Sequence, residues 1–250
     1  MNQDIKRVLK LLSATLVAAT FLGCQAEPGA KNIPFEPTKK TEKKLNDVVF
    51  NPNLDILFII DDSISMDSYQ QRVAANAKLF VDRFFATKFI NYHIGVTTSS
   101  LSDFQSKADG GELHQISGHR YVTRSTVGGA QILRQMMDVG LYGSTTEQFF
   151  SIHMEAFSPE LINGLNKGFY REDANLAIFV ITDSEDQSRI PASVAFDFLT
   201  TLKKGDKSKL FYYAAIVDDS KGNCRRDDAD RGLIREMARL HSPNSAIFDI

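Results

Sequence analysis

The stretch LDILFIIDDSISM, residues 54–66, contains the strongest indication of the fold. Its first seven residues form an almost unbroken apolar run, a pattern typical of a strand that is buried on both faces of a sheet. Two aspartates, two serines and a methionine follow directly. Ligands of α/β sheets bind at the carboxyl ends of strands, so these oxygen-bearing side chains predict a binding site where this strand ends.

Outward from this strand, the chain alternates strand-like apolar runs with segments of helical periodicity. We expect strands at 54–60, 91–98, 175–183, 209–218 and 245–250, and helices at 69–89, 145–157, 191–203 and 228–241. Residues 110–123 are typical of an exposed hairpin or edge strand. The alternation predicts an α/β fold, a doubly wound, mostly parallel sheet flanked by helices, with an antiparallel edge strand.

The first 23 residues predict a targeting segment that is not part of the fold. A basic start precedes an apolar stretch, residues 11–22, that is shorter than a membrane span but suits a secretory signal. The segment runs into Phe21-Leu22-Gly23-Cys24, which resembles the lipoprotein box of bacteria. The resemblance implies lipidation of Cys24 and, with Gln25 next, sorting to the outer membrane. Ordinary signal cleavage with an unmodified Cys24 is the alternative.

The composition indicates one sizeable domain behind a tether. The chain has 250 residues, of which 43% are hydrophobic and 24% charged, enough for a substantial core. Residues 24–46 are rich in proline and lysine and poor in apolar residues, so we expect a flexible tether followed by a folded domain at 47–250. The formal net charge of −2 gives no indication of a nucleic-acid partner.

Three oxygen-rich segments are expected to meet at the carboxyl edge of the sheet. One follows the first strand, one follows the 175–183 strand, and one opens the helix expected at 145–157. Their members are Asp61, Ser63 and Ser65; Asp183, Glu185 and Asp186; and Ser144, Thr145, Thr146 and Glu147. Taken alone, the third segment favours simple capping of a helix N-terminus. We expect Asp61 to face a solvent-filled crevice.

Together these segments resemble the metal-ion-dependent adhesion site of von Willebrand factor type A (VWA) domains, with its D-x-S-x-S loop, distant threonine loop and later aspartate. The resemblance covers residues 47–250 and is closest to bacterial lipoproteins that carry such a domain. Many members have glycine where Ile64 and Ser184 stand here. The resemblance implies a metal held by Asp61, Ser63, Ser65, Thr145 and Asp183, with Asp62, Glu147, Glu185 and Asp186 around it.

The chemistry of these donors favours a hard cation. Hydroxyl and carboxylate oxygens without a nearby His or Cys suit Mg²⁺, with Mn²⁺ or Ca²⁺ as alternatives. In the family, a carboxylate of a partner protein fills the open position of the metal, so the resemblance implies a protein ligand with an acidic side chain. We therefore expect a membrane-anchored, divalent-metal-dependent protein-binding module of the bacterial envelope, acting in adhesion or assembly, and not an enzyme.

Two other functions are compatible with the sequence. Adjacent acids after a first strand, here Asp61 and Asp62, also occur in Mg²⁺-dependent phosphotransfer proteins and phosphatases, although such phosphatases require a second aspartate where Ser63 stands. The sequence contains no P-loop, nucleophile elbow or H-E-x-x-H motif. The second alternative is a structural lipoprotein whose metal site is degenerate because of Ile64 and Ser184.

The other cysteine and the last strand yield a further expectation. If Cys24 carries lipid, Cys224 is an odd thiol in an oxidising compartment. The sequence stops on the apolar run SAIFDI, whereas related lipoprotein domains usually continue with a cysteine and a closing helix. The resemblance thus implies a shortened domain that lacks its final helix, and a complete domain with a tolerated Cys224 is the alternative.

Overall fold

The structure is a computed structural model that describes residues 51–67, 69, 84–86, 89–101, 110–216 and 232–249. Several predicted features lie outside the described residues. They are the signal segment and the tether with Cys24, most of the helix expected at 69–89, and the loop with Cys224.

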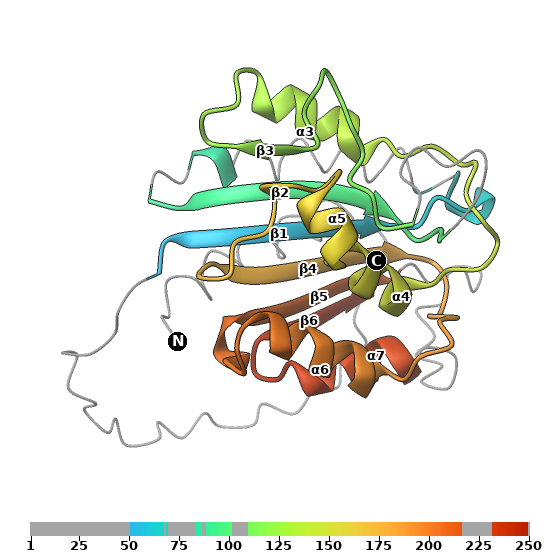
Figure 1. Cartoon of the computed structure of the whole chain (residues 1–250). Coiled ribbons are helices and arrows are strands. Elements are labelled where there is room, and N and C mark those ends of the chain that lie inside the picture. The colour runs from blue at the N-terminus through green and yellow to red at the C-terminus, as the bar shows by residue number, and fades with distance from the viewer. Residues whose placement is uncertain are drawn as a thin grey trace, which may run out of the picture.

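A six-stranded sheet forms the centre of the domain, in the order β3-β2-β1-β4-β5-β6 (Figure 1). All neighbouring pairs are parallel except β2 and β3, which are antiparallel. The strands are β1 (Asn53–Ile60), β2 (Asn91–Thr98), β3 (Tyr121–Thr123), β4 (Asn175–Thr182), β5 (Leu210–Ile216) and β6 (Ser245–Asp249). The predicted fold class is confirmed, including the antiparallel edge strand.

Helices lie on both faces of this sheet. The α-helices of the described residues are α3 (Gly129–Met137), α4 (Phe149–Ala156), α5 (Pro159–Asn163), α6 (Ala192–Leu202) and α7 (Gly232–Leu240). Short 3₁₀ turns occur at η2 (Ile64–Met66) and η3 (Lys207–Lys209). Helices α4, α6 and α7 pack on one face, and α3 packs on the other near β2 and β3 (Figure 1). Within the described residues, no helix combines the length and the apolar character needed to cross a membrane.

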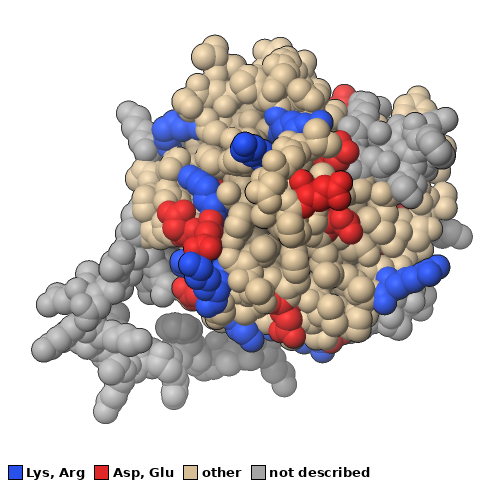
Figure 2. Space-filling view, viewed as in Figure 1, with Lys and Arg blue, Asp and Glu red and all other residues tan. Residues whose placement is uncertain are grey.

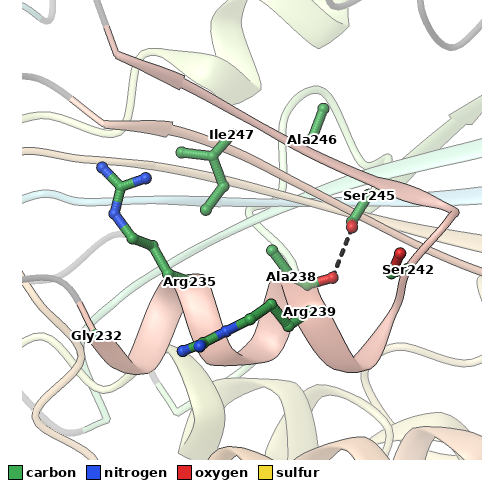
Figure 3. A pocket seen from close by; sticks show the side chains of 8 residues that line it. All are labelled: Gly232, Arg235, Ala238, Arg239, Ser242, Ser245, Ala246 and Ile247. Atoms are coloured by element: carbon green, nitrogen blue, oxygen red, sulfur yellow. Dashed lines mark hydrogen bonds between the residues drawn. The ribbon is translucent and has the colours of Figure 1, made fainter. Parts of the chain in front are cut away.

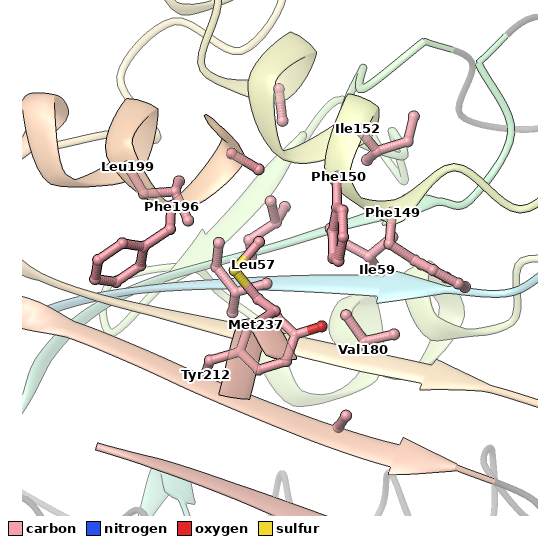
Figure 4. Close-up of a cluster of buried hydrophobic side chains, with 14 of the residues drawn as sticks. Leu57, Ile59, Phe149, Phe150, Ile152, Val180, Phe196, Leu199, Tyr212 and Met237 are labelled. Carbon is pink, nitrogen blue, oxygen red and sulfur yellow. The ribbon is translucent and has the colours of Figure 1, made fainter. Parts of the chain in front are cut away.

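The two faces of β1 explain its unbroken apolar sequence. Leu57 and Ile59 point into the core beneath α4, α6 and α7, whereas Ile56 and Phe58 point into the opposite core. Figure 4 shows the first of these cores, where Phe149 and Phe150 of α4 and Met237 of α7 pack over the strands. Because both faces are covered, β1 shows no alternation between apolar and polar residues.

Two helices differ from the sequence-based expectation. Helix α4 begins at Phe149 instead of residue 145, so the Ser144–Glu147 segment lies in the preceding loop. Helix α3 was not expected, although Ile132, Leu133 and Met136 are spaced as one buried helical face. The strand expected within 110–123 is shorter than that range and covers only Tyr121–Thr123.

A buried ion pair anchors the amino-terminal edge of the sheet. Asp55 of β1 is fully buried, and its carboxylate accepts hydrogen bonds from the Arg171 backbone N–H at 2.7 Å and from the Arg171 Nε at 2.8 Å. Arg171 Nη2 lies 2.7 Å from Asp55 Oδ1. Lys203 in turn donates from Nζ to the Arg171 carbonyl at 2.8 Å. This network attaches the loop before β4 to the start of β1.

The surface over α4, α5 and α6 carries charges of both signs in small groups (Figure 2). Lys and Arg side chains alternate there with Asp and Glu, and no single sign dominates this view. A strong field that would attract a polyanion is therefore absent from this described face.

Candidate functional site

The predicted site lies at the switch point of the sheet, where connections diverge to either side of β1. The chain passes from β1 to β2 and β3 on one side and returns to β4 on the other. Asp61 directly follows β1, and its N–H donates to the Ile181 carbonyl of β4 at 2.9 Å. Asp61 and Asp183 therefore leave adjacent parallel strands at the same edge, as the sequence predicted.

Asp61 is the buried centre of this edge. Its Oδ1 accepts from the Ser63 N–H at 2.9 Å, and its Oδ2 accepts from the Thr182 hydroxyl at 2.7 Å. The side chain is fully buried, so the expectation that it faces a solvent-filled crevice is wrong. Burial raises the pKa of Asp61, whereas the hydrogen bonds from Ser63 and Thr182 lower it. Asp61 thus holds the loop in shape as well as supplying negative charge.

Three further predicted ligands form a continuous chain of oxygens. The Ser63 and Ser65 hydroxyls are 2.9 Å apart, and the Ser65 hydroxyl donates to Asp183 Oδ1 at 3.1 Å. The short turn η2 makes this arrangement because it brings residues 63 and 65 onto one side, while Ile64 between them points outward and is 73% exposed. The structure thus brings together four of the five predicted ligands.

The fifth predicted ligand, Thr145, lies on the neighbouring loop and is exposed. Its loop is held by the Ser144 hydroxyl, which accepts from the Thr146 N–H at 3.1 Å. Helix α4 starts only at Phe149, with Gln148 in the N-cap position. The interpretation of Thr145 as a helix cap is therefore wrong, and the threonine is exposed in the loop that precedes α4.

A buried link between two loops was missed by sequence reasoning. The Ser100 hydroxyl donates to Asp62 Oδ1 at 3.0 Å and accepts from the Ser144 N–H at 2.8 Å. The Gly143 N–H also donates to the Asp62 carbonyl at 2.9 Å. Asp62 therefore ties the threonine loop to the end of β1. Ser100 follows β2, so the rule that identified the residues after β1 and β4 could also have identified it.

Glu147 places a further acid against this cluster. It is 2% exposed, and Gln187 Nε2 donates to its Oε2 at 2.9 Å. Burial, together with the negative charges of Asp61, Asp183 and Asp62, raises its pKa to about 7. The carboxylates of this edge thus repel one another, and a bound cation would relieve that repulsion.

Glu185 and Asp186, predicted to surround the metal, hold the N-termini of two helices. Asp186 Oδ1 accepts from the Phe150 N–H of α4 at 3.1 Å. Glu185 Oε1 accepts from the Ile234 N–H of α7 at 3.2 Å. Carboxylates at these positions satisfy helix N–H groups and interact favourably with the helix dipole. The two residues thus fix the loop that carries Asp183.

Two histidines of the described residues have structural partners. His153 of α4 is fully buried and packs against Phe150 and Tyr212. Burial lowers its pKa to about 3. His93 Nδ1 lies 2.8 Å from the Phe169 carbonyl. His153 is therefore a packed core residue.

The donor set fits a hard cation. Among the described residues, no group of three or more His, Cys, Asp or Glu side chains is arranged to hold a metal ion. The oxygens that do converge are those of Ser63, Ser65 and Asp183, backed by the buried charge of Asp61. Few carboxylates combined with hydroxyls are the donors of a site that retains water, which suits Mg²⁺.

Gly143 allows the threonine loop to approach Asp62. A Cβ atom at this position would lie 2.2 Å from the Asp62 Cγ, a distance that side chains do not reach. Gly143→Ala should therefore displace the Asp62 carboxylate and cost about 1–3 kcal/mol of unfolding free energy, measured by urea denaturation. Gly232→Ala is the matched control, since a Cβ there would meet nothing within 4 Å. Equal stability of the two variants would contradict the close approach.

Comparisons with known proteins give only distant structural likeness. No protein-family model matches the sequence, and no curated protein matches it significantly. Solved structures that match include proximal thread matrix protein 1 from the mussel byssus, at 14% identity and a TM-score of 0.44, covering 79% of this chain and 42% of that one. Another structure of that protein, with a zinc-occupied MIDAS motif, matches at 13% identity and a TM-score of 0.39, covering 66% of this chain and 38% of that one.

Proposed function

We propose that this protein is a membrane-anchored, divalent-metal-dependent protein-binding module of the bacterial cell envelope. The observation that carries the proposal is the chain of oxygens from Ser63 through Ser65 to Asp183 at the switch point, set over the buried carboxylate of Asp61. Ser63, Ser65 and Asp183 would hold Mg²⁺, and Thr145 would contribute from the adjacent loop. The bound metal would supply a Lewis-acidic position for an incoming carboxylate.

The surroundings of the site support binding of a protein. Ile64 is 73% exposed and Tyr142 is 66% exposed, and they belong to the two loops that carry the hydroxyl donors. Large apolar side chains in exposed positions are common at the centres of protein interfaces, and tyrosine is enriched among residues that dominate binding energy. A partner with an acidic side chain flanked by apolar residues would bind the metal through its carboxylate and pack its apolar residues on Ile64 and Tyr142.

The burial of the two aspartates favours binding over phosphotransfer. An aspartate nucleophile must reach its substrate, but Asp61 is fully buried and Asp62 is 1% exposed. Asp62 is also engaged by the hydroxyl of Ser100. These contacts favour a role for both side chains in stabilising the loop.

The experiment that tests this function measures metal binding and partner capture separately. Calorimetric titration of the purified chain with Mg²⁺ should show one saturable site. Envelope proteins should then be captured with Mg²⁺ and released by chelator, and Ile64→Ser should reduce capture at least about tenfold while Mg²⁺ affinity stays within about threefold. Chelator-insensitive capture, or Mg²⁺-dependent hydrolysis of p-nitrophenyl phosphate, would refute the proposal.

Membrane anchoring is a separate part of the proposal and rests on the Gly23-Cys24 junction of the sequence. Cys24→Ser should move the protein from the detergent-dependent membrane fraction to the soluble fraction, because the acyl chain would be lost and the tether offers no apolar replacement. Fractionation followed by immunoblotting measures this. Persistence of the variant in the membrane fraction would show that another feature holds it there.

A further inference from the structure

The outer edge of the sheet is formed by β6. Within the described residues β6 pairs only with β5, through the register from Tyr212↔Ser245 to Ile216↔Asp249. An edge strand presents backbone N–H and C=O groups that can pair with another extended segment. This edge is two strands away from the candidate metal site between β1 and β4.

A groove runs between this edge and helix α7. Its cavity has a volume of about 570 Å³ and is open to solvent, within the size range of ligand sites. Arg235, Ala238 and Arg239 line it from α7. On the opposite side it is lined by Ser242, Ser245, Ala246 and Ile247 at the turn and along β6 (Figure 3). A strand edge beside a helix is the arrangement by which several domains bind extended peptides.

The contacts within the groove hold its two walls together. The Ser245 hydroxyl donates to the Ala238 carbonyl at 2.6 Å, which fixes the start of β6 to the last turns of α7. Ala238 and Ile247 provide an apolar surface between these walls. The groove is therefore preformed, which lowers the entropy that binding would cost.

The positive charge of two arginines in the groove favours an acidic occupant. Arg235 and Arg239 stand one helical turn apart, and Figure 3 shows Arg235 rising toward Ile247 while Arg239 lies along α7. Arg239 is exposed. Guanidinium groups bind carboxylates with paired hydrogen bonds. A second copy of this chain would bring the same arginines against each other, so charge complementarity favours an acidic partner.

We propose that the groove between α7 and β6 binds an extended acidic segment of a partner protein by strand addition. The backbone of the segment pairs with the outer edge of β6, and its acidic side chains reach Arg239 on α7. Successive side chains of a strand point to opposite sides, so the acidic side chains lie on the α7 side with Ile247, and the apolar side chains lie on the other side next to Ala246. This site is independent of the metal-dependent function proposed above.

The test uses a fluorescein-labelled peptide of ten residues that alternates valine and glutamate. It is titrated with the full-length chain, purified in detergent, in buffer that contains chelator, so the metal site does not contribute. Fluorescence anisotropy should rise to saturation. A valine–lysine peptide and a valine–glutamate peptide with two central prolines should each bind at least tenfold more weakly, because the first lacks carboxylates and the second cannot pair as a strand.

Charge reversal locates the site. Arg239→Glu should weaken binding of the acidic peptide at least tenfold, whereas the matched reversal Arg134→Glu, exposed on α3 on the other face of the sheet, should leave it within twofold. Binding that survives Arg239→Glu, or that is equal for the acidic, basic and proline-containing peptides, would overturn the proposal. So would concentration-dependent dimerisation in sedimentation experiments that Arg239→Glu abolishes, since the edge would then be occupied by a second copy.

Discussion

Replacing Arg171 with alanine is expected to lower the free energy of unfolding by about 3–5 kcal/mol at pH 7. Asp55 is fully buried, and Arg171 supplies both its ion pair at 2.7 Å and its hydrogen bond from Nε. Truncation leaves a carboxylate inside the protein without its main compensating charge. Urea denaturation of the two proteins measures the difference.

If the loss of unfolding free energy in Arg171→Ala comes from the buried Asp55 carboxylate, it should depend on pH. Burial raises the pKa of Asp55 to about 6, against the lowering effect of Arg171. Because the folded-state pKa lies above that of the unfolded chain, the charged carboxylate destabilises the fold increasingly as pH rises through this range. The cost of Arg171→Ala should therefore shrink toward pH 4, where Asp55 is protonated and no longer needs the guanidinium.

The control is an exposed ion pair that includes Glu172, the residue after Arg171. Lys204 and Glu172 approach to 2.7 Å, but their side chains are 74% and 59% exposed. Glu172→Gln should change stability by no more than about 1 kcal/mol at any pH between 4 and 7. A similar cost for Arg171→Ala and Glu172→Gln would contradict the importance of burial.

The second large effect is expected at Asp61. Asp61→Asn should lower the affinity for Mg²⁺ by about a hundredfold or more, since loss of groups that only support metal ligands already costs about 10–100-fold. The amide can still accept from the Ser63 N–H, and the Thr182 hydroxyl has an alternative acceptor in the Ser184 carbonyl at 3.2 Å. The loop should thus keep its shape while the buried charge disappears. Isothermal titration calorimetry measures the affinity.

Asp55→Asn is the matched control for this charge removal. Asp55 is also a buried aspartate, but it lies near the start of β1, at the end of the strand away from the site, and pairs with Arg171. Its replacement should reduce thermal stability while leaving Mg²⁺ affinity within about threefold. An unchanged affinity in Asp61→Asn would remove the assignment of the site to this edge.

The sequence predicted the sheet and the position of the site because both depend on strong local patterns. The apolar runs of β1, β4 and β5 have few alternative structures, and parallel strands bring their carboxyl ends together. This geometry predicts that Asp61 and Asp183 lie close together. Strand order alone then decides which loops are neighbours.

The details that the sequence did not predict depend on contacts between distant segments. Helix α4 begins at Phe149 because Asp186, 36 residues further along the chain, accepts from the Phe150 N–H. Local capping rules find Ser144 and Thr145 instead. Ser100 is similar, since its role depends on Asp62 and Ser144, which come from other loops. The burial of Asp61 likewise follows from the packing of neighbouring loops around it.

The loop after β4 has a consequence for how this domain can vary. Asp183 meets Ser65, Glu185 meets the start of α7, and Asp186 meets the start of α4, so residues within a span of four serve three separate elements. Insertion or deletion of one residue here would shift all three contacts at once. Among related chains, this loop should therefore keep a constant length even where its residues are exchanged.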